Sequence, residues 1–462
     1  MNFRPRTLGV ESQFCEAITI ETINRWVPKA AIEAVIDETG VREQRARKLT
    51  AALTIWVMIG MCLYSQLSVG AVIQKLAKGL RLLWSDWEYP VATASAFSQR
   101  RYQLGVRVMQ LLFCQVCQPL ATKETRGAFL FGLRLMAMDG TKEDLPDTPE
   151  NATVFGRQSG PKGERGYPKA QTVLLSECGT HAVVDAEFAP CYTSERKLAM
   201  PLLRSIGAGM LLMFDRGFYG FDLILGVLQR QAHALGRLVA HVKPTLIQRL
   251  ADGSCLAYIY PSDSQRRKGG EQLLIRVIEY TFTDPQRPGY HQRHRLFTTL
   301  LDPHGCPALD LVCAYHERWE VELAIDELQV HQRLVNHPLR SLKPRGVIQE
   351  LYAILIAHYI VRAVMHEAAL RADIDPDRIS FVGTLRILQD ALIEFQLADP
   401  SCHSALWNRL LNDIANERLP ERRNRINPRV VKRTVIRFPL KRPQHFDLLQ
   451  PSMPFRSAVA LI

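Results

Sequence analysis

The sequence predicts an α/β protein, in which a core of mixed strands and helices lies between two mostly helical segments. Apolar residues recur at helical spacing through residues 49–83, whereas the apolar runs around 128–139, 168–176 and 181–188 are short and separated by Gly, Pro and charged residues. Helical periodicity is lost again between about 236 and 303, which predicts a mostly β insertion. The predicted divisions are a helical N-terminal domain at 1–125, a core at 126–375 that includes this insertion, and a helical and basic C-terminal region at 376–462.

Length and charge narrow the class of protein. A chain of 462 residues with 47% hydrophobic residues is long enough for two or three packed domains and is not disordered overall. Its 58 Lys and Arg exceed its 46 Asp and Glu, which gives a net charge of +12. This charge favours a polyanionic partner, with nucleic acid ahead of a membrane surface.

The apolar stretches do not predict membrane spans. The N-terminus has no apolar segment of the kind found in signal peptides, residues 51–64 are too few to span a bilayer, and residues 347–365 include charged side chains. Of ten cysteines, only Cys114 and Cys117 form a CxxC pair, and no second pair follows at zinc spacing. We interpret both as buried thiols on a helix in a soluble, cytoplasmic, nucleoid-associated protein.

Several basic segments are candidates for contact with a nucleic-acid backbone. A helix is predicted to begin at Ser95 and to expose Arg100 and Arg101, either to phosphates or only to solvent. The segment 265–270 is predicted to be a flexible basic loop. Between residues 418 and 442 the chain carries ten Lys or Arg and one acidic residue. Charge of this kind binds phosphates without reading sequence.

Three acidic residues occupy settings that a two-metal site requires. Asp139 and Asp215 each follow an apolar run that predicts a strand, and Glu322 lies within a helical pattern. A carboxylate at a strand end projects from the sheet, and a helix packed on that sheet can supply a third. Such carboxylates can bind two Mg²⁺ (or Mn²⁺) ions roughly 3.5–4 Å apart, which stabilise the attacking and leaving oxygens of an in-line displacement.

The order of elements between the two aspartates predicts a specific architecture. Three strands are followed by a helix at about 194–206, which Pro201 interrupts or ends, and then by a fourth strand that leads into Asp215. This is the order of elements in the ribonuclease-H-like fold.

The residues around Glu322 share one predicted helix face. At about 100° per residue, Tyr315, Arg318 and Glu322 fall close together, and Asp326 and Gln329 join them. Arg318 is suited to bind a phosphate with two hydrogen bonds and Tyr315 to donate another. The alternative is a surface salt bridge between Arg318 and Glu322. Glu317 and Glu320 point elsewhere, which leaves Asp326 as the local rival to Glu322.

At this point the chain resembles the insertion-sequence-four family of DDE transposases. Tyr315, Arg318 and Glu322 have the spacing of that family's signature helix. Further similar segments are 139–141, 147–151 with 155–156, 215–220, 349–352, 427–432 and the N-terminal 47–49. The family pattern has a lysine where this chain has Gln329, and His331 and Arg333 are candidate substitutes.

The resemblance implies cut-and-paste transposition of a bacterial insertion sequence. Asp139, Asp215 and Glu322 would bind the two metal ions, and a homodimer would join terminal inverted repeats to double-stranded target DNA. Tyr315, Arg318, Gln329 and Arg333 are predicted DNA contacts, and Trp319 either stacks on a flipped base or packs in the core. A predicted basic loop, which either follows the DNA backbone or is merely solvated, contains Arg157, Lys162, Arg165 and Lys169.

Two other functions stay open at this level. The first is a metal-dependent nuclease of the same fold that cuts DNA without joining it. The second is a DNA-binding protein that has lost catalysis, for which Gln329 is the hint.

Overall fold

The computed structural model describes residues 23–44, 49–83, 91–160, 163–287, 289–318, 320–333, 337–419 and 451–462. These residues form two compact units. The first takes its described residues from Met1–Phe129, Arg134–Ser205 and Trp319–Arg418, and the second from Leu130–Leu133, Ile206–Arg318 and Leu419–Ile462. Lys162, Trp319 and the basic tail between 420 and 442 lie outside the described residues.

The first unit contains an antiparallel sheet built on two long strands. β2 (Leu133–Asp144) pairs with β4 (Gly163–Glu177) from Met136 opposite Glu177 to Asp144 opposite Lys169. β5 (Val183–Pro190) pairs with the same part of β4, and β3 (Arg157–Gly160) forms a hairpin with its beginning. The short β1 (Phe129–Leu130) precedes β2 in the chain.

Two short helices accompany these strands, and each begins at a side-chain cap. Thr148 accepts a hydrogen bond from Asn151 N at 3.2 Å and Pro149 occupies the first turn of α7 (Pro149–Phe155). Ser194 caps α8 (Glu195–Leu202), which contains Pro201 in its last turn and is followed by the 3₁₀ turn η2 (Leu203–Ser205). The predicted helix with Pro201 near its end is therefore confirmed.

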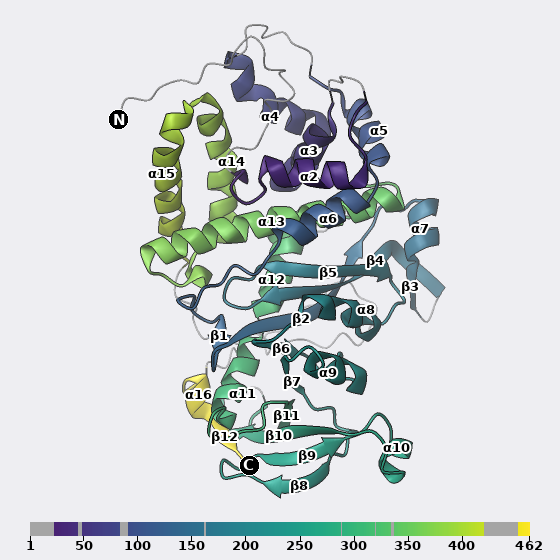
Figure 1. Ribbon diagram of the computed structural model, residues 1–462, viewed down its shortest axis with the longest axis vertical. Coiled ribbons are helices and arrows are strands. Elements are labelled where there is room, and N and C mark those ends of the chain that lie inside the picture. The colour runs from purple at the N-terminus through teal and green to yellow at the C-terminus, as the bar shows by residue number, and fades with distance from the viewer. Residues whose placement is uncertain are drawn as a thin grey trace, which may run out of the picture. The chain divides into compact units, whose positions relative to one another are not determined.

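The helices of the first unit pack around α13 (Pro344–Ala372), which is long and mostly buried. Figure 1 shows α13 between the sheet and the N-terminal helices, and it contacts α3, α6, α14, α15 and β5. The other helices are α2 (Lys29–Thr39), α3 (Ala51–Leu63), α4 (Val69–Leu83), α5 (Ala94–Leu104), α6 (Arg107–Val116), α12 (Glu320–Asp326), the π-helical η3 (Glu327–His331), η4 (Pro376–Arg378), α14 (Phe381–Leu397), η5 (Pro400–Cys402) and α15 (His403–Asn416).

By length and composition α13 could cross a membrane, but 89% of its most apolar stretch is buried inside the protein. It is the core helix of this unit. Cys117, at the end of α6, is buried as predicted. Cys114 is exposed, because it faces away from the buried side of α6, so that part of the cysteine prediction is wrong.

The second unit contains a mixed sheet in the order β6-β7-β11-β10-β9-β8 (Figure 1). β6 and β7 are parallel and joined through α9, and the remaining pairs are antiparallel. The last strand of the chain, β12, pairs with β10. The bounds are β6 (Met210–Phe214), α9 (Phe221–Leu228), β7 (His233–Arg237), β8 (Thr245–Arg249), β9 (Cys255–Ile259), α10 (Asp263–Arg267), β10 (Leu273–Phe282), β11 (His294–Thr298), α11 (Ala308–Glu317), α16 (Phe455–Ala458) and β12 (Val459–Leu461).

Three sequence-based predictions about basic segments are wrong in whole or in part. The segment 265–270 is a loop only in part, because its first three residues end the short helix that Ser262 caps and residues 268–270 form the turn after it. The segment with Arg157 and Lys169 is a β-hairpin rather than a loop. Arg101 is only 8% exposed. Its Nε donates to Gln349 Oε1 at 3.1 Å and its Nη2 to Ser341 Oγ at 2.8 Å.

Candidate functional site

Asp139 lies in the middle of β2 rather than at its end, which corrects the prediction. The strand continues to Asp144 because pairing with β4 continues through this stretch. Asp139 is half-buried and its Oδ1 accepts a hydrogen bond from Gly140 N at 2.8 Å. Since alternate residues of a strand share a face, Asp139, Thr141 and Glu143 project from the same side of β2.

The opposite face of β2 carries a close contact that explains Gly140. A Cβ at this position would lie 2.5 Å from Glu195 Oε1, so a larger residue would displace that carboxylate. Gln171 Nε2 also donates to Glu195 Oε1, at 3.2 Å. The Asp139-Gly140 pair therefore has an acidic side chain on one face of β2 and leaves room for the Glu195 side chain of α8 on the other.

Asp215 follows β6 directly, as predicted. Leu211–Phe214 are completely buried, and Asp215 is the first half-exposed residue after them. Its Oδ1 accepts a hydrogen bond from Gly217 N at 2.7 Å, which closes the turn that begins with Asp215. The carboxylate thus has a fixed orientation at the end of a rigid strand.

The second unit brings Tyr315 and Arg318 into the electrostatic range of Asp215. Arg318 caps the C-terminus of α11, and its guanidinium lies 5.7 Å from the centre of the Tyr315 ring. Burial raises the pKa of the Tyr315 phenol, Arg318 and Arg237 oppose this shift, and the Asp215 carboxylate adds to it. Arg318 is only 7% exposed, so it is a packed residue rather than a solvent-exposed arginine.

The helix around Glu322 is not the regular helix that the sequence predicted. α11 ends at Glu317, α12 begins at Glu320, and η3 then continues as a π-helix. The i→i+5 hydrogen bond from Gln332 N to Glu327 O, at 2.8 Å, adds a residue to that turn. A constant 100° per residue therefore does not describe the face from Tyr315 to Gln329, and Glu322 lies half-buried in α12.

Gln329 and Arg333 contact the face of β2 that carries Asp139. Gln329 Nε2 donates to Thr141 Oγ1 at 2.7 Å and to Glu143 Oε1 at 2.9 Å. Arg333 Nη1 donates to the other oxygen of Glu143 at 2.5 Å. The segment that follows Glu322 is therefore fixed to the face of β2 from which Asp139 projects. Sequence analysis missed Glu143, although its spacing of four from Asp139 was a usable signal.

The motif at 147–151 has a structural explanation in the same unit. Thr148 and Pro149 start α7, and the buried Asn151 Nδ2 donates to Ser341 O at 3.2 Å. The motif at 349–352 acts similarly, because Gln349 Nε2 donates to Arg101 O at 2.8 Å. Both motifs therefore connect segments that are distant in the chain.

Two of the predicted basic contacts are engaged in ion pairs on the hairpin. Arg157 pairs with Asp147 and also donates to Gly166 O at 2.5 Å. Lys169 pairs with Asp144. Arg165 has no described side chain. The predicted role of these residues in DNA contact stays a prediction.

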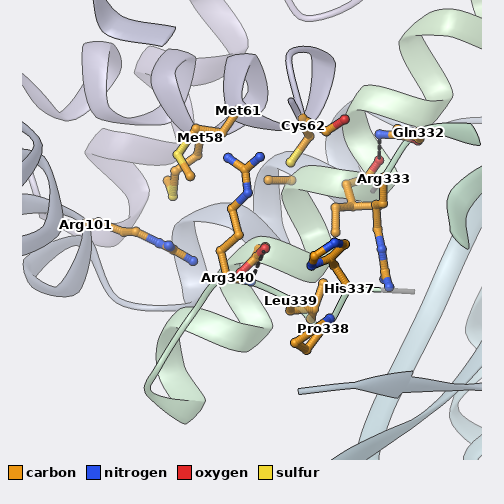
Figure 2. Close-up of a pocket in the computed structure, with 14 residues that line it drawn as sticks. Met58, Met61, Cys62, Arg101, Gln332, Arg333, His337, Pro338, Leu339 and Arg340 are labelled. Carbon is orange, nitrogen blue, oxygen red and sulfur yellow. Dashed lines mark hydrogen bonds between the residues drawn. The ribbon is translucent and has the colours of Figure 1, made fainter. Parts of the chain in front are cut away.

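A cavity of about 190 Å³ lies between α3, α13 and the segment after η3 (Figure 2). Its walls are mostly apolar and include Met58 and Met61. Gln332 and Arg333 line one side, and Gln332 Nε2 donates to Ile354 O at 3.0 Å. The cavity is thus lined in part by Gln332 and Arg333, the two residues that directly follow η3.

Asp139 and Glu322 belong to the first unit and Asp215 to the second. Among the described residues, no three His, Cys, Asp or Glu side chains gather closely enough to hold one metal ion. The donor set itself fits a hard divalent cation, because Mg²⁺ and Mn²⁺ prefer carboxylate oxygens.

Comparison with known proteins identifies the family. Residues 17–114 match the family described as insertion element 4 transposase N-terminal, and residues 131–360 match the transposase DDE domain. The chain is 27% identical over 426 residues to the transposase InsG for insertion sequence element IS4 from Escherichia coli (strain K12), which covers 91% of this chain and 93% of the relative.

A solved structure of the piggyBac transposase synaptic complex with hairpin DNA is also similar, with a TM-score of 0.40 and 13% identity over 87% of this chain and 85% of the other.

The chain belongs to the insertion-sequence-four family of DDE transposases. Its fold is α/β with a ribonuclease-H-like core, and it is the transposase of an insertion sequence, an enzyme that acts on DNA with divalent metal. These findings confirm the predicted family, fold class and enzyme class. A protein of this family acts in the cytoplasm, where the DNA is.

Proposed function

We propose that this transposase cuts and joins DNA by two-metal phosphoryl transfer, with Asp139, Asp215 and Glu322 as its metal ligands. The observation that carries the proposal is the attachment of the Glu322 segment to the face of β2 that presents Asp139. Two bound Mg²⁺ or Mn²⁺ ions would stabilise the charge on the attacking and leaving oxygens. Asp139 and Asp215 keep their orientation through backbone hydrogen bonds, so little reorganisation is needed.

Tyr315 and Arg318 are proposed to orient a DNA phosphate beside Asp215. Their packing against each other limits the rotamers of both side chains. A rigid guanidinium loses little conformational freedom when it binds a phosphate. Asp215 lies near enough to influence the Tyr315 phenol, which supports a shared role.

The DNA partners and assembly complete the proposal. The substrates are double-stranded terminal inverted repeats and target DNA, and a homodimer holds two ends together at the nucleoid. The segments 1–125 and 376–462 bind the repeats, the core at 126–375 carries catalysis, and Arg157, Lys162, Arg165 and Lys169 contact the backbone. Trp319 is a candidate for stacking on a flipped base.

Gln329 does not favour the alternative of a lapsed enzyme. Its amide has an internal role at Thr141 and Glu143, and Arg333 supplies a cation at the same carboxylate. Gln329, which stands where the family has a lysine, therefore helps to hold the Glu322 segment against β2.

The test supplies purified protein with a labelled repeat end, Mg²⁺ and plasmid target. The unmodified protein is expected to cleave the end and join it to the plasmid, and Asp215→Asn and Glu322→Gln are expected to do neither while still binding the end. Cleavage without joining would indicate a nuclease. Cleavage and joining by either variant would show that the assigned ligands are wrong.

A further inference from the structure

The π-helical segment η3 is held by polar side chains on two sides. It follows α12 directly and contains Glu327 and Gln329, and Arg333 lies just beyond it. π-helical turns are rare and occur frequently at functional sites, because the inserted residue redirects the side chains around it. In this protein the side chains concerned are Glu327, which contacts α13, and Gln329 and Arg333, which contact β2.

On one side, Glu327 reaches into the buried interior against α13. Arg362 Nε donates to Glu327 Oε2 at 2.8 Å, and His358 Nε2 lies 3.0 Å from the same oxygen. Arg362 also contacts His181, which lies 3.1 Å from Asp377. Burial opposes ionisation of Glu327, but Arg362 and His358 hold its pKa at about 2. A charged Glu327 thus binds η3 to the core helix.

On the other side, Glu143 of β2 receives both Gln329 and Arg333. Glu143 is only 6% exposed and each of its oxygens accepts a hydrogen bond from one of these residues. A buried carboxylate without such partners would be strongly unfavourable. The contact therefore requires η3 to keep one register against β2.

We propose that Glu327 and Glu143 are positioning residues, which fix η3 between α13 and β2 and thereby set the position of Glu322 relative to Asp139. This inference rests on the proposed catalytic role of Glu322 and Asp139. The chain needs a cation opposite Glu143. It uses Arg333 for this purpose, and a lysine at position 329 would serve as well, because Gln329 already contacts Glu143.

The experiment measures hydrogen–deuterium exchange of the full-length protein in Arg333→Gln and in Arg333→Gln combined with Gln329→Lys. Loss of the cation is expected to speed exchange of the amides at 327–333 about tenfold. The added lysine is expected to restore slow exchange. Glu150→Gln is the matched control, because Glu150 is an exposed carboxylate in the first turn of α7.

A second readout separates positioning from simple stability or DNA contact. Arg333→Gln is expected to raise the Mn²⁺ concentration for half-maximal cleavage about tenfold, and the Kd for a repeat end is measured beside it to detect any DNA contact by Arg333. The lysine should reverse the Mn²⁺ effect.

Unchanged exchange in Arg333→Gln, or exchange that the lysine does not restore, would overturn the proposal. A weaker Kd with an unchanged Mn²⁺ requirement would also overturn it, in favour of a DNA contact by Arg333. Failure of the proposed function would look different, because Glu322→Gln would then still cleave whatever the exchange data show.

Discussion

Glu322 and Glu327 lie five residues apart but in opposite surroundings. Glu327 is buried and bound by Arg362 and His358, which hold its pKa at about 2. Glu322 remains half-buried on α12, and Asp139 and Asp215 are also partly exposed. The difference separates two uses of a carboxylate. Glu327 is paired with the Arg362 cation and stabilises the fold, and the other three carboxylates stay accessible enough for the proposed binding of a cation from solution.

The largest effect expected from this comparison concerns activity. Asp215→Asn removes the charge of a proposed metal ligand at the end of β6 and should lower the cleavage rate about 10,000-fold or more, equivalent to roughly 5.5 kcal/mol of transition-state stabilisation. The measurement is cleavage of a labelled repeat end in Mg²⁺. The midpoint of urea unfolding should change little, since Asp215 is half-exposed. A large loss of stability would indicate that Asp215, like Glu327, has a structural role.

Glu327→Gln should lower the free energy of unfolding, which Asp215→Asn should leave nearly unchanged. It leaves the buried Arg362 without a counter-charge, and breaking a buried ion pair costs about 3–5 kcal/mol. Urea unfolding followed by circular dichroism measures the free energy of unfolding. Glu394→Gln, which breaks the exposed pair with Arg409, is the control and should cost less than about 1 kcal/mol. Equal effects of the two substitutions would contradict a structural role of Glu327.

The buried cluster of Glu327, Arg362 and His181 should make the free energy of unfolding depend on pH. Burial and Arg362 lower the pKa of His181 to about 4, below its ordinary value of 6.5, so folding excludes a proton that the unfolded chain binds. The free energy of unfolding should therefore fall as pH decreases from about 6.5 to about 4. Glu327 adds a second decrease between about 4.5 and 2, because its folded pKa is also lowered.

His181→Asn should reduce the upper part of this pH dependence without removing it, because burial also lowers the pKa of His316 to about 4. Asn has no titrating group and tolerates the left-handed backbone at this position, where φ is +56°. Urea unfolding at pH 7, 6, 5 and 4 provides the measurement. An unchanged slope between pH 6.5 and 4 in the variant would assign the effect to another group.

The smallest effect is expected from a substitution of Arg157 on the hairpin of β3 and β4. Arg157 pairs with the exposed Asp147, and such surface pairs contribute about 0.2–1 kcal/mol. Arg157→Ala should therefore change stability little but weaken DNA binding and reduce the slope of log Kd against log salt by about one. Asp147→Asn serves as the control, because it breaks the same pair and keeps the cation. An unchanged salt slope in Arg157→Ala would exclude a phosphate contact.

The strands and Asp215 were predictable because buried strands require short apolar runs. The run before Asp215 is β6, and its residues are buried as the pattern indicates. Asp139 was assigned to a strand end wrongly, because polar residues after it still pair with β4. Alternation along β2 would have drawn attention to Glu143, since it shares a face with Asp139.

Other features of the structure could not be predicted from the neighbouring sequence. The break between α11 and α12 and the later π-helical turn both interrupt the 3.6-residue periodicity on which helix-face analysis depends, so Tyr315 and Gln329 do not lie on one continuous helix. Arg101 looks like a surface residue until Gln349 and Ser341 are brought to it. Likewise Glu327 looks like an exposed helix charge, because Arg362 lies 35 residues away.

The most direct test compares Glu322→Gln with Asp326→Asn in one assay of repeat-end cleavage. Asp326 lies on the same helix, is exposed and pairs with His331 at 3.2 Å, so it controls for loss of an acidic residue in this segment. Asp326→Asn is expected to cleave at nearly the rate of the unmodified protein, and Glu322→Gln is expected not to cleave at all. Cleavage by Glu322→Gln, with loss of cleavage in Asp326→Asn, would contradict the assignment of Glu322 as the third carboxylate.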